Sequence, residues 1–302
     1  MMYFRVREAE GILKQFSKMF WGFVRYRPSI SVGVILVGAT LTLGFVISLF
    51  APYDPRRWNQ VPRDLPPSLQ YLLGTTSLGQ DIFWLMTWSI RNSLLIGVIG
   101  SAFGLLVGAI MGLIAGYKGG TIDRLILLFA DTFIIIPGFP ILILLSTLLR
   151  RQMNMVMLGL IIAFLTWGMP VRNIRSMILS LRERDFTYIS LFSGFKTFNI
   201  VLSEYMPYVF PWIAASFMSR INMAIGMEVT LATLGLSSLQ EATLGTMIYW
   251  ALKYQAMIRG LWWWIATPVI IVIIIVLGLY LVSIGVAEYL NPRTRLYRVA
   301  EE

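Results

Sequence analysis

The sequence predicts an all-α membrane protein with six transmembrane helices. Of its 302 residues, 57% are hydrophobic and only 13% are charged, and the mean hydropathy is +0.74. These values lie outside the usual range of soluble domains. Apolar runs of roughly 20 residues recur along the chain, and each is long enough to cross the ~30 Å hydrocarbon core of a bilayer as a helix. One helical bundle in a membrane accounts for the whole length.

The chain contains no cysteine and no histidine. Disulfides, thiolate nucleophiles, imidazole bases and the usual zinc ligands are therefore excluded together, and we expect no metal or cofactor site in this chain. A net charge of +10 is also typical of nucleic-acid binding, but the basic residues here flank the apolar runs. That placement is typical of membrane orientation and of contact with anionic lipid. We therefore expect this chain to contact a lipid bilayer and not to bind nucleic acid.

The first expected unit, residues 1–28, is a cytoplasmic amphipathic segment. Apolar side chains recur there at helical spacing among lysines and arginines, which predicts a helix lying in the membrane interface. The first span follows at about residues 30–50. It ends at the segment Ala51 to Pro55, because proline cannot continue a helical hydrogen-bond ladder. A polar loop with prolines then extends to about Gln80.

The second span, at about residues 94–116, has glycine at every fourth position. Because residues four apart share one helix face, this repeat removes the side chains from a whole face and lets another helix approach closely. Glycine is also generally common in membrane helices, but five in register favour close packing. The five glycines are Gly100, Gly104, Gly108, Gly112 and Gly116.

Four more spans complete a transmembrane domain at residues 29–290. The expected ranges are about 125–149, 155–171, 207–236 and 262–286. Pro137 and Pro140 should kink the first of these, and Trp262, Trp263 and Trp264 suit the headgroup boundary at the start of the last. Residues 291–302 form a short polar tail. More than twice as many lysines and arginines lie on the side of the two chain ends as on the other, which predicts that both ends are cytoplasmic.

The cytoplasmic loop at residues 182–207 has the composition of a docking segment. It begins around Arg184, Asp185 and Phe186, and its apolar side chains have no core of their own. We interpret it as a short helix, a glycine turn and a second helix. A cytoplasmic partner would cover the aromatic side chains. Alternatively, the loop is an amphipathic hairpin that lies on the lipid surface.

This loop resembles the signature of permease subunits of ABC importers, written E-A-A, three residues, G, nine residues, I-x-L-P. Gly194 and the pair Met206-Pro207 stand at the matching spacing. Tyr188, Ile189 and Ser190 occupy the E-A-A positions, so the family's glutamate is absent. This chain therefore lacks the side chain with which the family makes an ionic contact to the ATPase at this position.

Other segments resemble the dipeptide/oligopeptide-type permeases in that family's order over nearly the whole chain. The short loop after the first span is similar to that of the second, C-type subunit. The matching segments are Ala51 to Pro55, Leu72 to Asp81, Arg91 to Leu94, Gly112 to Gly120, Ser180 to Phe186 and Leu234 to Leu236.

The resemblance implies a type I ABC importer permease fold in the inner membrane of the cell, with a cytoplasmic coupling helix. It implies a non-catalytic subunit that imports peptides or oligosaccharides with a second, B-type permease, two ATPase subunits and an external solute-binding protein. ATP and magnesium would bind to the ATPase subunits, since this chain has no G-x-x-x-x-G-K-[ST] phosphate loop. The expected coupling residues are Arg184, Asp185, Phe186, Ile189, Phe192, Gly194, Met206 and Pro207, with Phe186, Ile189, Phe192 and Gly194 at the core of the contact.

Three charged residues, Asp131, Arg220 and Glu228, fall inside expected spans, where an unpaired charge is costly and suggests a function. Each is also compatible with a purely structural partner. Asp131 and Glu228 lie at positions where the family that the chain resembles often has acidic residues, and this resemblance favours hydrogen bonding between helices, or lining of the transport path, over proton relay. Arg91 precedes its span and is interpreted as an interfacial or packing residue.

Two other classes of function share some of these features. A secondary transporter or channel would have the same spans, but it does not need the docking loop and usually has an internal repeat, which we do not find. An intramembrane enzyme would need a catalytic constellation, and Asp131 and Glu228 form no recognisable pair. Neither alternative explains the loop at residues 182–207.

Overall fold

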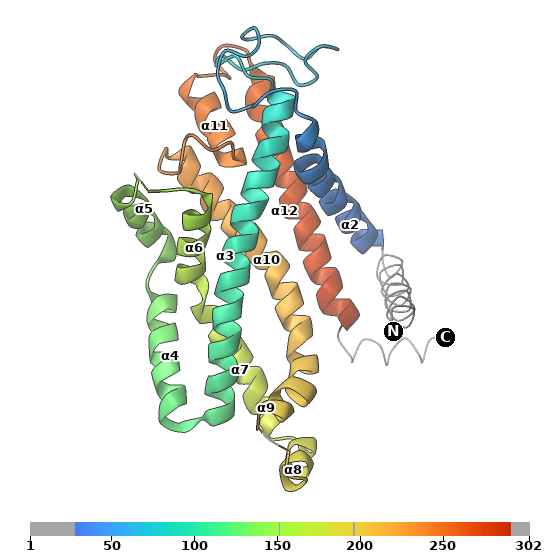
Figure 1. The fold of residues 1–302 in the computed structure, drawn as a ribbon, viewed down its shortest axis with the longest axis vertical. Helices are drawn as coiled ribbons and strands as arrows, with labels where there is room; N and C mark the ends of the chain where they lie inside the picture. Colours follow the sequence, from blue (N-terminus) through green and yellow to red (C-terminus); the bar gives the residue numbers. More distant parts are fainter. Residues whose placement is uncertain (1–27, 151, 196, 291–302) are drawn as a thin grey trace, which may run out of the picture.

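The computed structural model describes residues 28–150, 152–195 and 197–290, which form an elongated bundle of helices with no named strand (Figure 1). The predicted all-α class is therefore confirmed for these residues. Nearly all of the amphipathic segment at 1–28 and the whole tail at 291–302 lie outside them. The elements in chain order are α2 (Pro28–Leu41), the π-helix η1 (Thr42–Val46), the 3-10 helix η2 (Ile47–Phe50), α3 (Ile82–Lys118), α4 (Gly120–Ile135), α5 (Gly138–Leu148), α6 (Met155–Thr166), α7 (Gly168–Arg182), α8 (Asp185–Phe192), α9 (Thr197–Ile200), the π-helix η3 (Val201–Tyr205), α10 (Met206–Thr233), α11 (Leu244–Lys253) and α12 (Trp262–Leu290).

Three of the described helices are long and apolar enough to cross a bilayer, at Pro28–Phe50, Ile82–Lys118 and Trp262–Glu288. The number rises to five if the bent pairs α4–α5 and α6–α7 each count as one span. α10 is not in this count, although it has 28 residues. Its charged and amide side chains lower its hydropathy. The sixth transmembrane helix therefore stays a prediction.

The bundle has two distinct ends (Figure 1). Helix α8 and the turn between α3 and α4 lie at one end, which we call the α8 end. Helix α11 and the loop at residues 51–81 lie at the opposite end, which we call the α11 end. Helix α2, with which the described chain begins, runs toward the α11 end, and α12, with which it finishes, runs away from that end.

The central helix α3 begins well before the expected start of its span at Leu94. Asp81 caps it, because its side chain accepts a hydrogen bond from the backbone N–H of Phe83 at 2.9 Å. Ile82 and Ile90 are fully buried in the early turns. Polar neighbours hide this helical start in the sequence, and Arg91 lies within the helix instead of preceding it.

The glycine repeat of α3 lies against α6 and α7. An added Cβ at Gly100 would come within 3.3 Å of Ile162, and one at Gly104 within 3.2 Å of the Ala163 carbonyl. Farther along, a Cβ at Gly108 would meet Pro170 Cβ at 2.5 Å. Gly112 and Gly116 are equally tight against α7. The glycine face of α3 therefore lets α6 and α7, the two halves of a bent helix pair, pack closely against its backbone.

Two helix pairs are broken near the middle of the bundle. As Pro137 and Pro140 predict, α4 and α5 meet at 81°, and the residue before Pro137 is extended as proline requires. α6 and α7 meet at 47°, next to Gly168 and Pro170. Pro170 has no N–H to donate to the carbonyl of Thr166 four residues earlier, so the ladder opens there.

The aromatic cluster at the start of α12 differs from the expectation. Trp262 is exposed, but Trp264 is 1% exposed and belongs to the core beside Tyr254. The indole N–H of Trp263 donates to the carbonyl of Thr75 at 3.3 Å. Two of the three tryptophans therefore fasten the loop at residues 51–81 and helix α11, because that loop folds back over them.

Candidate functional site

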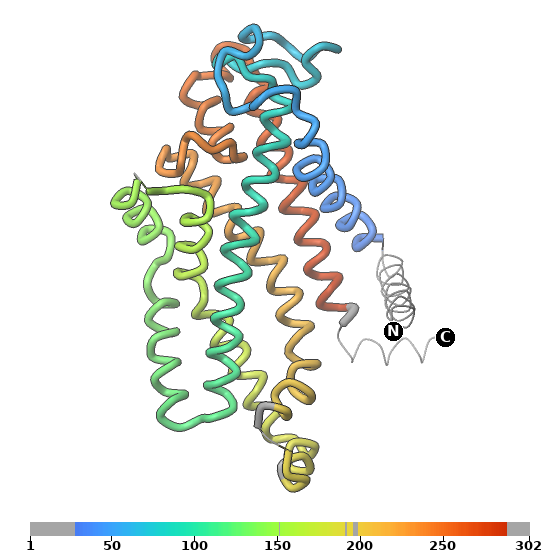
Figure 2. Tube along the Cα trace, in the orientation of Figure 1, coloured from blue at the N-terminus to red at the C-terminus, as the bar shows by residue number. Residues whose placement is uncertain are grey.

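Helix α8 projects from the α8 end of the bundle, and Figure 2 traces the chain from α7 through it and back into α10. Gly194 ends this helix with φ +78°, a conformation that suits glycine, and an added Cβ there would meet nothing within 4 Å. Pro207 lies in the first turn of α10, which Met206 begins. It follows the π-helix η3 closely, and its ring has no N–H to donate to the carbonyls of that helix. The helix, glycine turn and return of the chain occur where the sequence places them.

One face of α8 is fastened to the rest of the chain by hydroxyl groups. Thr187 is 1% exposed, and its hydroxyl donates to the carbonyl of Leu181 at 2.9 Å. The hydroxyl of Tyr205 in turn donates to Thr187 at 3.3 Å. Ser190 donates to the carboxylate of Glu204. Positions three apart on one helix face thus hold α8 against the segment that precedes α10.

Phe186 packs against its own chain. Its ring stacks on Tyr208 with centroids 5.9 Å apart and lies 6.5 Å from the ring of Tyr205. The guanidinium of the exposed residue Arg184 lies 6.0 Å from the centre of the Tyr208 ring. The expected coupling residue Phe186 is therefore an anchor of α8, with only part of its ring open to a partner.

The other face of α8 and the turn that follows it are apolar and open. Phe192 is 90% exposed and Ile189 is 65% exposed. Tyr188 and Phe195 extend this surface, each about half exposed. Asp185 lies at the start of the helix and is also exposed. We call Tyr188, Ile189, Phe192 and Phe195 the α8 patch; nothing in the described part of the chain covers it.

Two carboxylates of α4 pair with arginines of α7. Asp131, singled out in the sequence, lies 2.8 Å from a nitrogen of Arg172. Asp123, which the sequence gives no reason to select, takes both of its hydrogen bonds from Arg175, one at 2.6 Å. The pair that includes Asp131 is partly exposed, whereas Asp123 and Arg175 are more buried. These pairs connect neighbouring helices.

Glu228 of α10 is fully buried at the junction of α3, α10 and α11. The hydroxyls of Ser93 and Thr243 donate to its two oxygens, at 3.2 Å and 2.5 Å. Each hydroxyl also accepts a backbone N–H from the first turn of α11, from Leu244 at 3.0 Å and from Thr246 at 3.1 Å. The carboxylate thus accepts hydrogen bonds from the two hydroxyl groups that pair with backbone N–H groups at the start of α11. Such N–H groups have no partner within their own helix.

Helices α3 and α10 both make close contacts with the start of α11 here. Asn92 of α3 donates from its side-chain amide to the carbonyl of Ala242 at 2.7 Å. Gly245 passes so close to α10 that an added Cβ would lie 2.6 Å from Ala232 and 3.0 Å from the carboxylate of Glu228. We call Asn92, Ser93, Glu228, Thr243 and Thr246 the Glu228 junction. It holds α11 in place at the α11 end.

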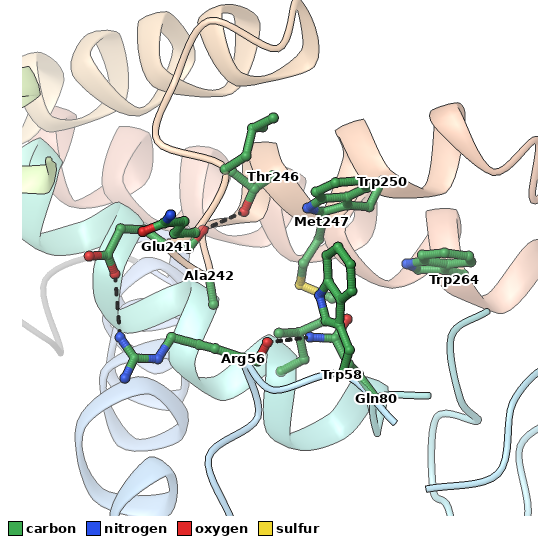
Figure 3. A pocket seen from close by; sticks show the side chains of 12 residues that line it. Arg56, Trp58, Gln80, Glu241, Ala242, Thr246, Met247, Trp250 and Trp264 are labelled. Carbon is green, nitrogen blue, oxygen red and sulfur yellow. Dashed lines mark hydrogen bonds and ion pairs between the residues drawn. The ribbon is translucent and has the colours of Figure 1, made fainter. Parts of the chain in front are cut away.

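A small polar pocket lies beside this junction, where the loop at residues 51–81 meets α11 (Figure 3). Arg56 lies 3.8 Å from the carboxylate of Glu241, and the side-chain amide of Gln80 donates to the carbonyl of Arg56 at 3.2 Å. Trp58 packs edge-on against Trp250. The space between these residues is about 30 Å³, which suits a water molecule and no larger ligand. We therefore interpret the pocket as a seal between loop and helix.

Three groups of this loop, one tyrosine and two aspartates, have shifted pKa values. Burial, followed by the charge of Asp81, raises the pKa of Tyr53 to about 12, so its hydroxyl stays protonated and faces Asp81 at 3.5 Å. Burial also raises the pKa of Asp81 itself. Hydrogen bonds from Arg56 hold the pKa of Asp54 below its usual range. These groups fix the loop.

The described residues contain no group of three or more acidic side chains that could hold a metal ion.

Residues 104–296 match the protein family described as the binding-protein-dependent transport system inner membrane component. This match begins inside α3 and includes all the following helices.

Similar proteins cover most of the chain. The oligopeptide transport system permease protein OppC of Bacillus subtilis (strain 168) is 29% identical over 297 residues, 95% of this chain and 94% of that protein. The dipeptide transport system permease protein DppC of the same organism is 24% identical over 96% of this chain and 90% of that protein. OppC of Lactococcus lactis subsp. cremoris (strain SK11) is 32% identical over 67% of this chain and 69% of that protein.

Proposed function

Because the chain belongs to the family of binding-protein-dependent transport system inner membrane components, we propose that it is one of two membrane subunits of an ATP-driven importer of peptides. Its relatives OppC and DppC carry names that refer to oligopeptide and dipeptide transport, and they align with nearly the whole chain. The chain has the type I permease fold and acts as the second, C-type subunit beside a B-type permease. The match of the family over residues 104–296 is the observation that carries this conclusion.

The α8 patch is the contact through which ATP hydrolysis in separate subunits drives this permease. It is an apolar surface at the tip of the α8 end, and the described residues leave it open. Thr187, Ser190 and Phe186 hold the helix from behind. A push on the patch is therefore transmitted to α7 and α10. Arg184, Asp185, Gly194, Met206 and Pro207 shape and flank this contact.

In this assembly the α8 end faces the cytoplasm and the α11 end faces an external solute-binding protein. The distribution of lysine and arginine along the sequence, which is richer on the side expected to hold both chain ends and the loop at residues 182–207, supports this orientation. Two ATPase subunits bind ATP and magnesium, because this chain lacks a phosphate loop. The Glu228 junction fastens α11 at the outer mouth, where substrate enters. The chain itself performs no catalytic step.

Purification and uptake together test this proposal. An affinity-tagged form of the chain is expected to copurify with ATPase chains and a second permease. Proteoliposomes that contain this complex and the solute-binding protein should take up a labelled peptide only when ATP reaches the ATPase subunits. Uptake that needs no ATP and follows an ion gradient would instead support a secondary transporter.

A further inference from the structure

A cavity of about 270 Å³ lies where both bent helix pairs break. The break between α4 and α5 borders it at Gly138, and the break between α6 and α7 borders it at Thr166 and Gly168. Arg220, Met223 and Met227 of α10 line the remaining wall. Discontinuous helices near the middle of a membrane are a usual place for substrate sites in transporters.

Arg220 lies near the midpoint of α10 (Met206–Thr233), at a depth where a charge is costly. One of its N–H groups donates to the carbonyl of Thr166 at 2.9 Å. This carbonyl needs a donor because Pro170, four residues later, has none. A guanidinium has five N–H groups, so this bond uses a small part of its capacity.

The charge of Arg220 has no counter-ion within this chain as far as the structure describes it. The ion pairs among the described residues join other arginines to Asp54, Asp64, Asp123, Asp131 and Glu241. Helices α5 and α7 also begin at the cavity wall, and the positive end of a helix dipole favours a negative ligand. Met223 and Met227 can adapt to differently shaped neighbours. The cavity is therefore a cationic site with flexible apolar walls.

We propose that this cavity binds the C-terminal carboxylate of a peptide during its passage, with Arg220 as the counter-ion. This inference rests on the proposed function. The terminal carboxylate is the anionic group that all linear peptides with a free C-terminus share, and a neutral oligosaccharide lacks it. A cavity of about 270 Å³ is at the lower limit for small-ligand sites, so it suits one end of a peptide and leaves the rest to the partner permease.

The natural absence of cysteine allows a direct test in the complete transporter. Met223→Cys places one thiol of this chain in the cavity. We expect a negatively charged methanethiosulfonate reagent to modify this thiol faster than a positively charged reagent of similar size. The ratio of the two rates should be roughly 10-fold higher than at a site without a charge. Arg220→Gln should remove this preference and Arg220→Lys should keep it. Met257→Cys, an exposed position in the loop before α12, is the matched control, and residue 220 should not affect it.

The second measurement uses ligand protection and needs no change at Arg220. Trialanine should slow the modification of Met223→Cys, and trialanine amide, which lacks the carboxylate, should not. Equal protection by the two peptides would overturn the proposal. The proposal would also be overturned if the reagents showed no charge preference, or if Arg220→Gln left that preference unchanged. Loss of the second permease from the Arg220→Gln complex would overturn it as well, because Arg220 would then pair with that subunit. A complex that shows the charge preference but no ATP-driven uptake would contradict the proposed function alone.

Discussion

Phe192→Asp is expected to weaken binding of the ATPase subunits severely while the permease itself folds and inserts normally. Phe192 is 90% exposed, so its own chain loses almost no packing when the ring is removed. At a buried contact, the same ring contributes roughly 1.5–3 kcal/mol, and a carboxylate in its place adds the cost of burying an unpaired charge. The association should weaken by at least about 100-fold. Copurification of the ATPase subunits and their hydrolysis rate measure the effect.

Two further variants separate this contact from a general effect of added charge. Leu69→Asp introduces the same carboxylate at a fully exposed leucine of the loop at residues 51–81, and it should copurify the ATPase subunits as the unchanged chain does. Phe192→Leu keeps an apolar side chain and should retain most of the binding. If Phe192→Asp also retains full binding, the loop at residues 182–207 is an amphipathic hairpin on the lipid surface and not a docking segment.

Glu228→Ala is expected to destabilise the folded chain by about 2–5 kcal/mol. The substitution leaves a space in a fully buried place and takes away the acceptor of Ser93 and Thr243. Both hydroxyls also satisfy N–H groups of α11, so the start of this helix loses its order. The temperature of unfolding in detergent and the amount of protein in the membrane should both fall.

Glu228→Gln and Glu241→Ala serve as controls for this result. Glutamine keeps the shape and one carbonyl acceptor, so we expect a much smaller loss of stability. Glu241 is partly exposed and lies 3.8 Å from Arg56, so its removal should cost less than about 1 kcal/mol. Equal losses for Glu228→Ala and Glu241→Ala would mean that the Glu228 junction does not hold α11.

The sequence alone predicts the elements that depend on local chemistry. The span that ends at Phe50, the break at Pro137 and the turn at Gly194 follow from hydropathy, from the missing N–H of proline and from the backbone freedom of glycine. The start of α3 does not follow in this way. Ile82 to Ser93 is helical because it is buried against other elements, and its polar residues resemble those of a loop.

Side-chain partners far apart in the sequence could not be predicted. Glu228 stands out as a buried charge, but nothing local indicates that Ser93 and Thr243 bond to it from two other helices. Asp123 precedes its expected span and resembles a surface residue until Arg175 is placed beside it. Phe186 and Phe192 have equal apolar character, and only the fold turns the first inward and the second outward.

Cross-linking from position 192 is the most direct test of the central claim that an ATPase subunit binds this chain from the cytoplasmic side. Phe192→Cys provides the sole thiol of this chain for a membrane-impermeant reagent and for a thiol-linked photo-crosslinker. We predict modification in inside-out vesicles and not in intact cells, together with a covalent product that contains an ATPase subunit. Modification from outside intact cells, or a product with no ATPase subunit in the assembled transporter, would contradict the account.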